Sequence, residues 1–133
     1  MLKFSRFASL LLLPLVAAVP AQAGQKITQN VQINVYPWMT TASGGVGDAR
    51  ASSDSLQTIQ CAVSTWPGYA RGLCIATNKN NQTVSCYATD PELLKAIYSI
   101  GPNSYVYFSF PSGSTDCDAV TVENGSRYRP VAP

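Results

Sequence analysis

Four cysteines are the residues of this chain whose type and spacing best suit covalent chemistry: Cys61, Cys74, Cys86 and Cys117. An even number of cysteines in a small chain with an export signal is typical of two disulfides. Zinc is the alternative, but the spacings of 13, 12 and 31 residues contain no C-x2-C pair, and the chain has no histidine. A catalytic thiol needs a nearby base and an unpaired cysteine, and the sequence indicates neither. We therefore expect structural disulfides, no metal and no cofactor.

Three pairings of these cysteines are open. The Trp-Pro-Gly-Tyr sequence at 66–69 predicts a type II turn, and a hairpin folded about it places Cys61 opposite Cys74. The next hairpin places Cys74 opposite Cys86 in the same way, so geometry alone allows either neighbour for Cys74. We prefer Cys61 with Cys74 and Cys86 with Cys117, because the distant second pair then holds the second half of the chain against the first. Each bond is expected to stabilise the fold by about 3–4 kcal/mol.

Asp116 and Asp118 flank Cys117 and form a pair of carboxylates that could do chemistry. On a strand, residues two apart project from the same face about 7 Å from each other. Such a pair suits Ca²⁺ binding or the acid and base roles of glycoside cleavage. A solvated strand start beside a loop explains the same pair without chemistry, and the absence of histidine removes the commonest general base. We expect a non-enzymatic protein, with a small carboxylate-dependent hydrolase using Asp116 and Asp118 as the alternative.

Residues 40–53 are small, polar and rich in glycine, with Gly44-Gly45-Val46-Gly47 at the centre. Phosphate-binding loops continue into Lys-Ser/Thr or lie in a strand-to-helix nucleotide-binding unit. Asp48-Ala49-Arg50 supplies neither feature. We expect a flexible connection here, in which Arg50 forms an ion pair with Asp48 or Asp54.

Aromatic residues are the candidates for contact with another molecule, because rings with a polar group offer a large contact area at modest entropic cost. Tyr105 and Tyr107 alternate with apolar residues and share one strand face. That face is a contact surface if it is open, and a second core layer if the helix or the C-terminal tail covers it. The other candidates are Trp38, Tyr69 and Trp66, although Trp66 is expected to cap the core of its hairpin rather than to serve as a ligand platform.

Alternation of apolar and polar residues predicts the elements that must position these side chains. Strands are expected at 29–36, 55–65, 72–77, 83–88, 104–110 and 117–123. Between the fourth and fifth strands, Asp90-Pro91-Glu92 is typical of a helix start, and Gly101-Pro102 ends an apolar stripe. The predicted fold class is α+β: a mainly antiparallel sheet of about six strands with one helix, 91–100, stabilised by disulfides.

One conflict accompanies this prediction. The register that places Cys61 opposite Cys74 turns Leu73 and Ile75 to the other face of the sheet. Either both faces of the sheet are covered, or the register is displaced by one residue.

The N-terminal residues have the three parts of a secretory signal in order. Residues 1–7 carry two positive charges, residues 8–19 are mainly apolar, and Ala21-Gln22-Ala23 offers small residues at a cleavage site. The apolar run of 12 residues is shorter than the roughly 20 that a bilayer requires. We expect a signal peptide at 1–23, a single small disulfide-bonded domain at 24–133, and a periplasmic or secreted protein with no membrane attachment after cleavage.

The charge balance argues against a nucleic-acid partner. The chain has 9 Lys and Arg against 7 Asp and Glu, but Lys3 and Arg6 belong to the expected signal, which leaves seven of each sign. Proteins that bind nucleic acids or anionic membranes use a basic surplus to neutralise phosphates. The oligomeric state is left open by this reasoning.

Three segments together carry a resemblance: Asp48 to Asp54 before Cys61, the stretch from Cys74 to Tyr87, and Tyr105 to Phe110 followed by Cys117. This pattern resembles small exported proteobacterial proteins that have an Ala-Arg-x-Ser-x-Asp run before the first of four cysteines. The resemblance covers about residues 46–122 and implies a bacterial, exported, disulfide-bonded domain, with no activity attached.

By elimination we expect an interaction module that contacts a protein or a glycan through its aromatic strand faces and the 40–53 segment. Besides the hydrolase, the remaining alternative is a structural component of an envelope or an extracellular assembly.

Overall fold

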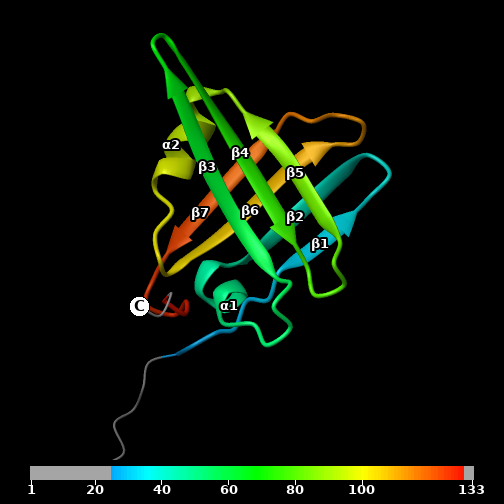
Figure 1. Ribbon diagram of the computed structural model, residues 1–133, viewed down its shortest axis with the longest axis vertical. Helices are drawn as coiled ribbons and strands as arrows, with labels where there is room; N and C mark the ends of the chain where they lie inside the picture. The colour runs from blue at the N-terminus through cyan, green and yellow to red at the C-terminus, as the bar shows by residue number, and fades with distance from the viewer. Residues whose placement is uncertain (1–24, 131–133) are drawn as a thin grey trace, which may run out of the picture.

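A computed structural model describes residues 25–130, so the expected signal peptide lies outside the described residues. The described chain forms seven strands and two helices (Figure 1). In chain order these are β1 (Gln32–Val35), β2 (Met39–Gly45), α1 (Val46–Arg50), β3 (Thr58–Trp66), β4 (Tyr69–Thr77), β5 (Thr83–Ala88), α2 (Pro91–Tyr98), β6 (Ser104–Pro111) and β7 (Ala119–Asn124).

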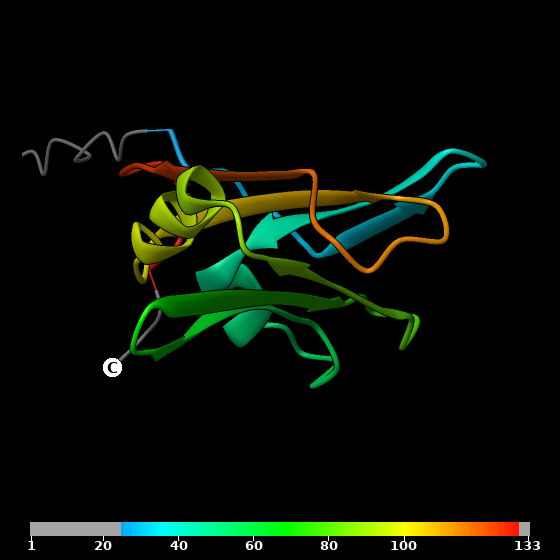
Figure 2. The ribbon, with the colours of Figure 1, turned by 90° about the horizontal axis from the view of Figure 1, so that it is seen from above.

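The strands form two sheets that pack face to face, as the view from above shows (Figure 2). One sheet has the order β1-β2-β6-β7 and the other the order β3-β4-β5, and every pairing between neighbouring strands is antiparallel. The core between the sheets contains Val106 and Phe108 from β6, together with Cys74 and Cys86 from the three-stranded sheet, all fully buried. Each of these strands therefore buries alternate residues, as a half-exposed antiparallel sheet requires.

Helix α2 begins as its sequence predicts and packs against the inner face of the three-stranded sheet. The Asp90 carboxylate accepts hydrogen bonds from the backbone N–H groups of Glu92 and Leu93, and Pro91 occupies the first turn. The helix approaches the sheet at Gly72, where an added Cβ would lie 2.6 Å from Ile97 Cδ1. The helix ends at Tyr98 rather than at Ile100, because the last N–H groups turn back to carbonyls three residues earlier.

The α+β class, the mainly antiparallel pairing and the disulfides are confirmed, whereas the single six-stranded sheet with one helix is wrong: residues 25–130 form seven strands in two sheets and a second helix, α1. The seventh strand, β2, lies in the segment that was expected to be a flexible connection. Its small residues let neighbouring backbone approach closely: a Cβ on Gly44 would lie 3.1 Å from Val31 Cα. The strand also pairs with β6 over its whole length, from Met39 opposite Pro111 to Gly45 opposite Tyr105. This long-range pairing outweighs the weak strand propensity of glycine and serine.

Both disulfides join the preferred cysteines. Cys61 lies opposite Cys74 and forms one bond, and Cys86 bonds to Cys117 in the segment that runs beside β5. The second bond ties β5 to the connection between β6 and β7, where the backbone of Tyr87 also exchanges hydrogen bonds with Thr115 and Cys117. Disulfides of this kind are typical of proteins in oxidising compartments.

The predicted register of the three-stranded sheet is also right. Leu73 and Ile75 accordingly lie half-buried on its outer face. Tyr87, opposite Leu73, shields part of this face, with the Arg71 guanidinium carbon 3.5 Å from its ring centre. Among residues 25–130, no helix is long and apolar enough to span a membrane.

Candidate functional site

The β3–β4 turn presents an aromatic pair to solvent. Trp66 and Tyr69 lie opposite each other at the end of the hairpin, with ring centres 5.6 Å apart. Gly68 has a φ of 76°, which explains why the turn requires glycine at this position. The rings are 55% and 50% exposed, so the structure does not bury Trp66 as a cap on the hairpin core.

A groove of about 460 Å³ lies beside this pair, between the hairpin and the start of α2. Its walls combine the two rings with the hydroxyl-bearing residues Thr65 and Thr89, and Leu94 contributes apolar surface. None of the lining residues is charged: they are Thr65, Trp66, Gly68, Tyr69, Ala70, Thr89, Pro91 and Leu94. We call this site the aromatic groove.

A second aromatic pair lies at the β1–β2 turn, well separated from the first (Figure 1). Tyr36 and Trp38 stack with ring centres 5.7 Å apart, and Trp38 is 68% exposed. Ser112, from the connection between β6 and β7, donates its N–H to the Trp38 carbonyl and its hydroxyl to the Tyr36 carbonyl. None of the cavities described here includes this pair.

Tyr105 and Tyr107 lie on the outer face of the four-stranded sheet, where the C-terminal segment reaches one of them. Tyr128 stacks on Tyr105 with ring centres 5.7 Å apart, and Tyr128 itself is buried. Tyr107 is half-buried. The sequence left open whether the tail would cover this face, and the tail does cover it at Tyr105.

Glu123 fastens the tail to this face. Its carboxylate accepts hydrogen bonds from the Tyr128 hydroxyl and from Arg127 Nη2. Those hydrogen bonds, with Tyr128 the larger cause, lower the pKa of Glu123, and the same contact with Glu123 raises the pKa of Tyr128. The tail from 124 to 130 is therefore a packed part of the fold, which its irregular sequence did not indicate.

The aspartate pair of the hydrolase alternative lies on an exposed connection. Asp118 accepts a hydrogen bond from the Ser109 hydroxyl, and the Asp116 N–H donates to Ser114 Oγ. Neither residue lines any of the three cavities. In the part of the chain that the structure describes, no group of three or more His, Cys, Asp or Glu residues could hold a metal ion. The structure thus supplies no observation in favour of carboxylate catalysis.

The acidic residues around Arg50 have structural roles that the sequence analysis did not assign. Asp48 is buried and accepts a hydrogen bond from the Gln29 N–H. Asp54 accepts from the N–H groups of Leu56 and Gln57 and from the Gln57 side chain. These hydrogen bonds, the Gln57 side chain first, lower the pKa of Asp54 to about 2. Within residues 25–130, neither carboxylate forms the ion pair with Arg50 that the sequence predicted.

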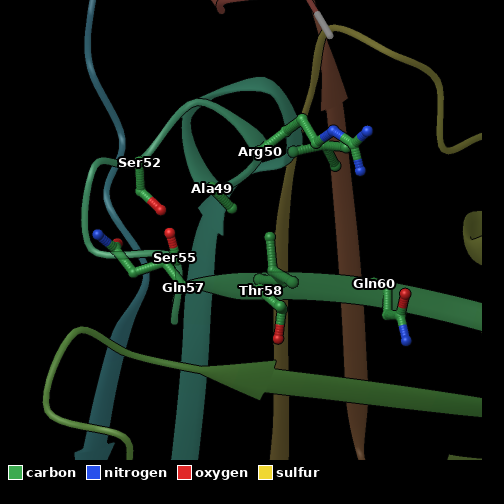
Figure 3. A pocket seen from close by; sticks show the side chains of 9 residues that line it. Ala49, Arg50, Ser52, Ser55, Gln57, Thr58 and Gln60 are labelled. Carbon is green, nitrogen blue, oxygen red and sulfur yellow. The ribbon is translucent and has the colours of Figure 1, made fainter.

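A second cavity, of about 450 Å³, lies where α1, the 51–57 connection and the start of β3 meet (Figure 3). Arg50 and Gln60 lie on one side of the view, and Ser52, Ser55 and Gln57 lie on the other. We call this site the Arg50 cavity. Its lining includes Ala49, Arg50 and Ser52 of the Ala-Arg-x-Ser-x-Asp run, to which the sequence analysis assigned no function.

No protein family, curated protein or solved structure matches the chain. Its function therefore has to be argued from the geometry of the chain itself.

Proposed function

We propose that this protein is an exported, non-enzymatic interaction module, periplasmic or secreted, that binds a neutral glycan in the aromatic groove. The observation that carries the proposal is the pair of exposed rings, Trp66 and Tyr69, beside an uncharged groove of about 460 Å³. Cavities of roughly 300–1,000 Å³ that combine apolar walls with a few polar groups are typical of ligand sites.

The groove offers the two kinds of contact that a sugar requires. On this proposal the ring faces of Trp66 and Tyr69 cover the apolar C–H surface of a pyranose, and Thr65 and Thr89, which line the groove, supply hydroxyl groups that can exchange hydrogen bonds with those of the sugar. Covering the exposed half of each ring removes on the order of 100 Å² of apolar surface from water, which is worth about 2–3 kcal/mol per ring.

The rings are also ordered before a ligand arrives. Their mutual contact at 5.6 Å and the tight turn that carries them reduce the entropy that binding would cost. The two disulfides support export, because they match an oxidising compartment.

The proposal is tested by screening the purified protein against a panel of neutral oligosaccharides, with Trp66→Ser and Tyr69→Ser as the site variants. Each variant should lose binding by at least tenfold while keeping the circular dichroism spectrum of the parent protein. Trp38→Ser is the matched control, since it removes a still more exposed ring from the other turn and should bind normally.

Binding that survives both site variants would refute the assignment of the groove. Failure of the whole panel, combined with retention of a protein from a periplasmic or secreted fraction that depends on Trp66, would replace the glycan with a protein partner.

A further inference from the structure

The Arg50 cavity is separate from the aromatic groove and has a different chemical character. Its apolar lining comes from Ala49 and Ile59, which are 5% and 4% exposed, and from Val46. Arg50 and Ser55 also line the cavity, and Thr58 and Gln60 line it from the other face of β3, since they alternate with Ile59 along the strand (Figure 3). The site therefore combines a single positive charge with neutral hydrogen-bonding groups and an apolar surface.

The charge in the cavity is uncompensated among the described residues. No carboxylate lines the cavity, and Arg50 forms no ion pair within residues 25–130. The nearest acidic residues in the chain are engaged elsewhere: Asp48 accepts from the Gln29 N–H, and Asp54 accepts from four donors in its own loop. The cavity consequently favours a ligand that carries a negative charge.

The loop that forms one wall is held in a fixed shape. Ser55 has a φ of 57°, a conformation that is uncommon for residues other than glycine. The hydrogen bonds of Asp54 to the N–H groups of Leu56 and Gln57 maintain it. Gln57 in turn joins this loop to the chain before β1, because its side-chain oxygen accepts from the Val31 N–H at 2.8 Å. A wall constrained in this way loses little entropy on binding.

The opposite wall is the start of β3, an edge strand that pairs with β4 alone among the described strands. Ile59 is almost fully buried in this wall, so it contributes apolar packing beside the cavity.

We propose that the Arg50 cavity binds a small organic carboxylate. The planar guanidinium matches the two oxygens of a carboxylate in a bidentate pair. The body of the ligand lies against the apolar lining at Val46, Ala49 and Ile59, with its polar groups toward Ser52 and Ser55. One cation balances one carboxylate, whereas phosphate sites usually add a cradle of several backbone N–H groups.

The test is a ¹⁵N-NMR titration of the intact oxidised protein with three acids and their neutral counterparts: acetate and acetamide, benzoate and benzamide, D-glucuronate and D-glucose. At least one acid should shift the amide signals of residues 49–60 saturably, and its neutral counterpart should not. Arg50→Gln should weaken that binding at least tenfold. The matched control is Lys95→Gln, which removes one exposed positive charge from α2, outside the cavity, and should leave the affinity unchanged.

Three results would overturn the proposal: no saturable shift with any acid, equal shifts with an acid and its neutral partner, or an affinity that Arg50→Gln does not alter. Because the Arg50 side chain is exposed, the substitution should not disturb folding. Arg50→Lys provides a second variant that keeps the charge but loses the bidentate pair, and it should bind with an intermediate affinity. The signals of Trp66 and Tyr69 report separately on the aromatic groove, so the two proposals can fail independently.

Discussion

Replacing Gly47 with alanine places two physical effects in direct opposition. Gly47 lies in α1, where intrinsic helix propensity favours alanine over glycine by about 1 kcal/mol. The C-terminal segment, however, runs directly against this glycine. An added Cβ would lie 1.9 Å from the Arg129 carbonyl oxygen and 2.8 Å from the Pro130 carbonyl carbon. A Cβ contact below 3.0 Å is essentially never observed, so the Arg129 carbonyl must move by at least 1.1 Å, that is 3.0 minus 1.9.

The cost of that movement should exceed the gain in propensity. Overpacking of a filled site costs about 1–3 kcal/mol. If the tail detaches instead, the protein loses the stacking of Tyr128 on Tyr105, worth about 0.5–1.5 kcal/mol, in addition to the burial of Tyr128. Subtracting the propensity gain of about 1 kcal/mol leaves a net loss, and we expect Gly47→Ala to lower the free energy of unfolding by up to about 2 kcal/mol.

Urea denaturation of the oxidised protein measures this difference, with Gly101→Ala as the control. The Cβ of that control meets nothing closer than 3.8 Å, so its free energy of unfolding should stay within about 0.5 kcal/mol of the parent. A Gly47→Ala protein that is more stable than the parent by about 1 kcal/mol would refute the reasoning, since it would mean that propensity alone decides and that the tail does not pack on α1.

Three further predictions concern stability. In urea denaturation, Cys86→Ala/Cys117→Ala should lower the free energy of unfolding by about 4 kcal/mol and Cys61→Ala/Cys74→Ala by about 3 kcal/mol. The difference is expected because the two bonds close segments of 31 and 13 residues. The reverse order would contradict the chain-entropy account. Asp54→Ala should lower the urea midpoint at pH 6. Since folding depresses the Asp54 pKa from 3.8 to about 2, its contribution is present above pH 4 and should fade as the pH falls toward 2; a difference that is constant with pH would contradict this. Asp90→Ala should lower the free energy of unfolding by about 1 kcal/mol because the helix cap is lost, whereas Asp90→Asn keeps an acceptor oxygen and should lower it much less. Equal losses of stability in thermal denaturation would argue against the cap.

Local signals predicted the elements whose causes are local. The cap and proline at the start of α2 lie within three residues of each other, and the turn at 66–69 carries its own glycine. This turn sets the register of β3 and β4, which in turn places Cys61 opposite Cys74. The disulfide pairing was then predicted by preferring Cys86 with Cys117 as the second pair, because these two cysteines are far apart in the sequence.

The parts that the sequence did not predict depend on distant contacts. β2 forms because its small residues fit between β1 and β6, and nothing in residues 39–45 alone shows that fit. The glycines read as signs of flexibility in fact allow close backbone approach, as Gly47 does with Arg129. The division into two sheets likewise depends on how hairpins from separate parts of the chain pack together.

The candidate sites divide in the same way. Trp66 and Tyr69 are an exposed pair because they flank a predicted turn, so their position could be anticipated. The Arg50 cavity could not, because it needs α1, the loop held by Asp54 and the edge of β3 to meet. The Asp54-x-x-Gln57 spacing, with a carboxylate that binds the N–H groups that follow it, is the signal that could have identified this loop as ordered.

The register places Cys61, Cys74 and Cys86 side by side in one row across the three-stranded sheet. Antiparallel partners in such a row have Cα atoms about 4.5–5.5 Å apart, within the range that a disulfide can bridge. Removing Cys117 alone would leave the Cys86 thiolate next to the Cys61–Cys74 bond, where it can attack Cys74 by thiol–disulfide exchange and release Cys61. A single cysteine substitution would therefore scramble the sulfur connectivity of the whole sheet instead of deleting one bond.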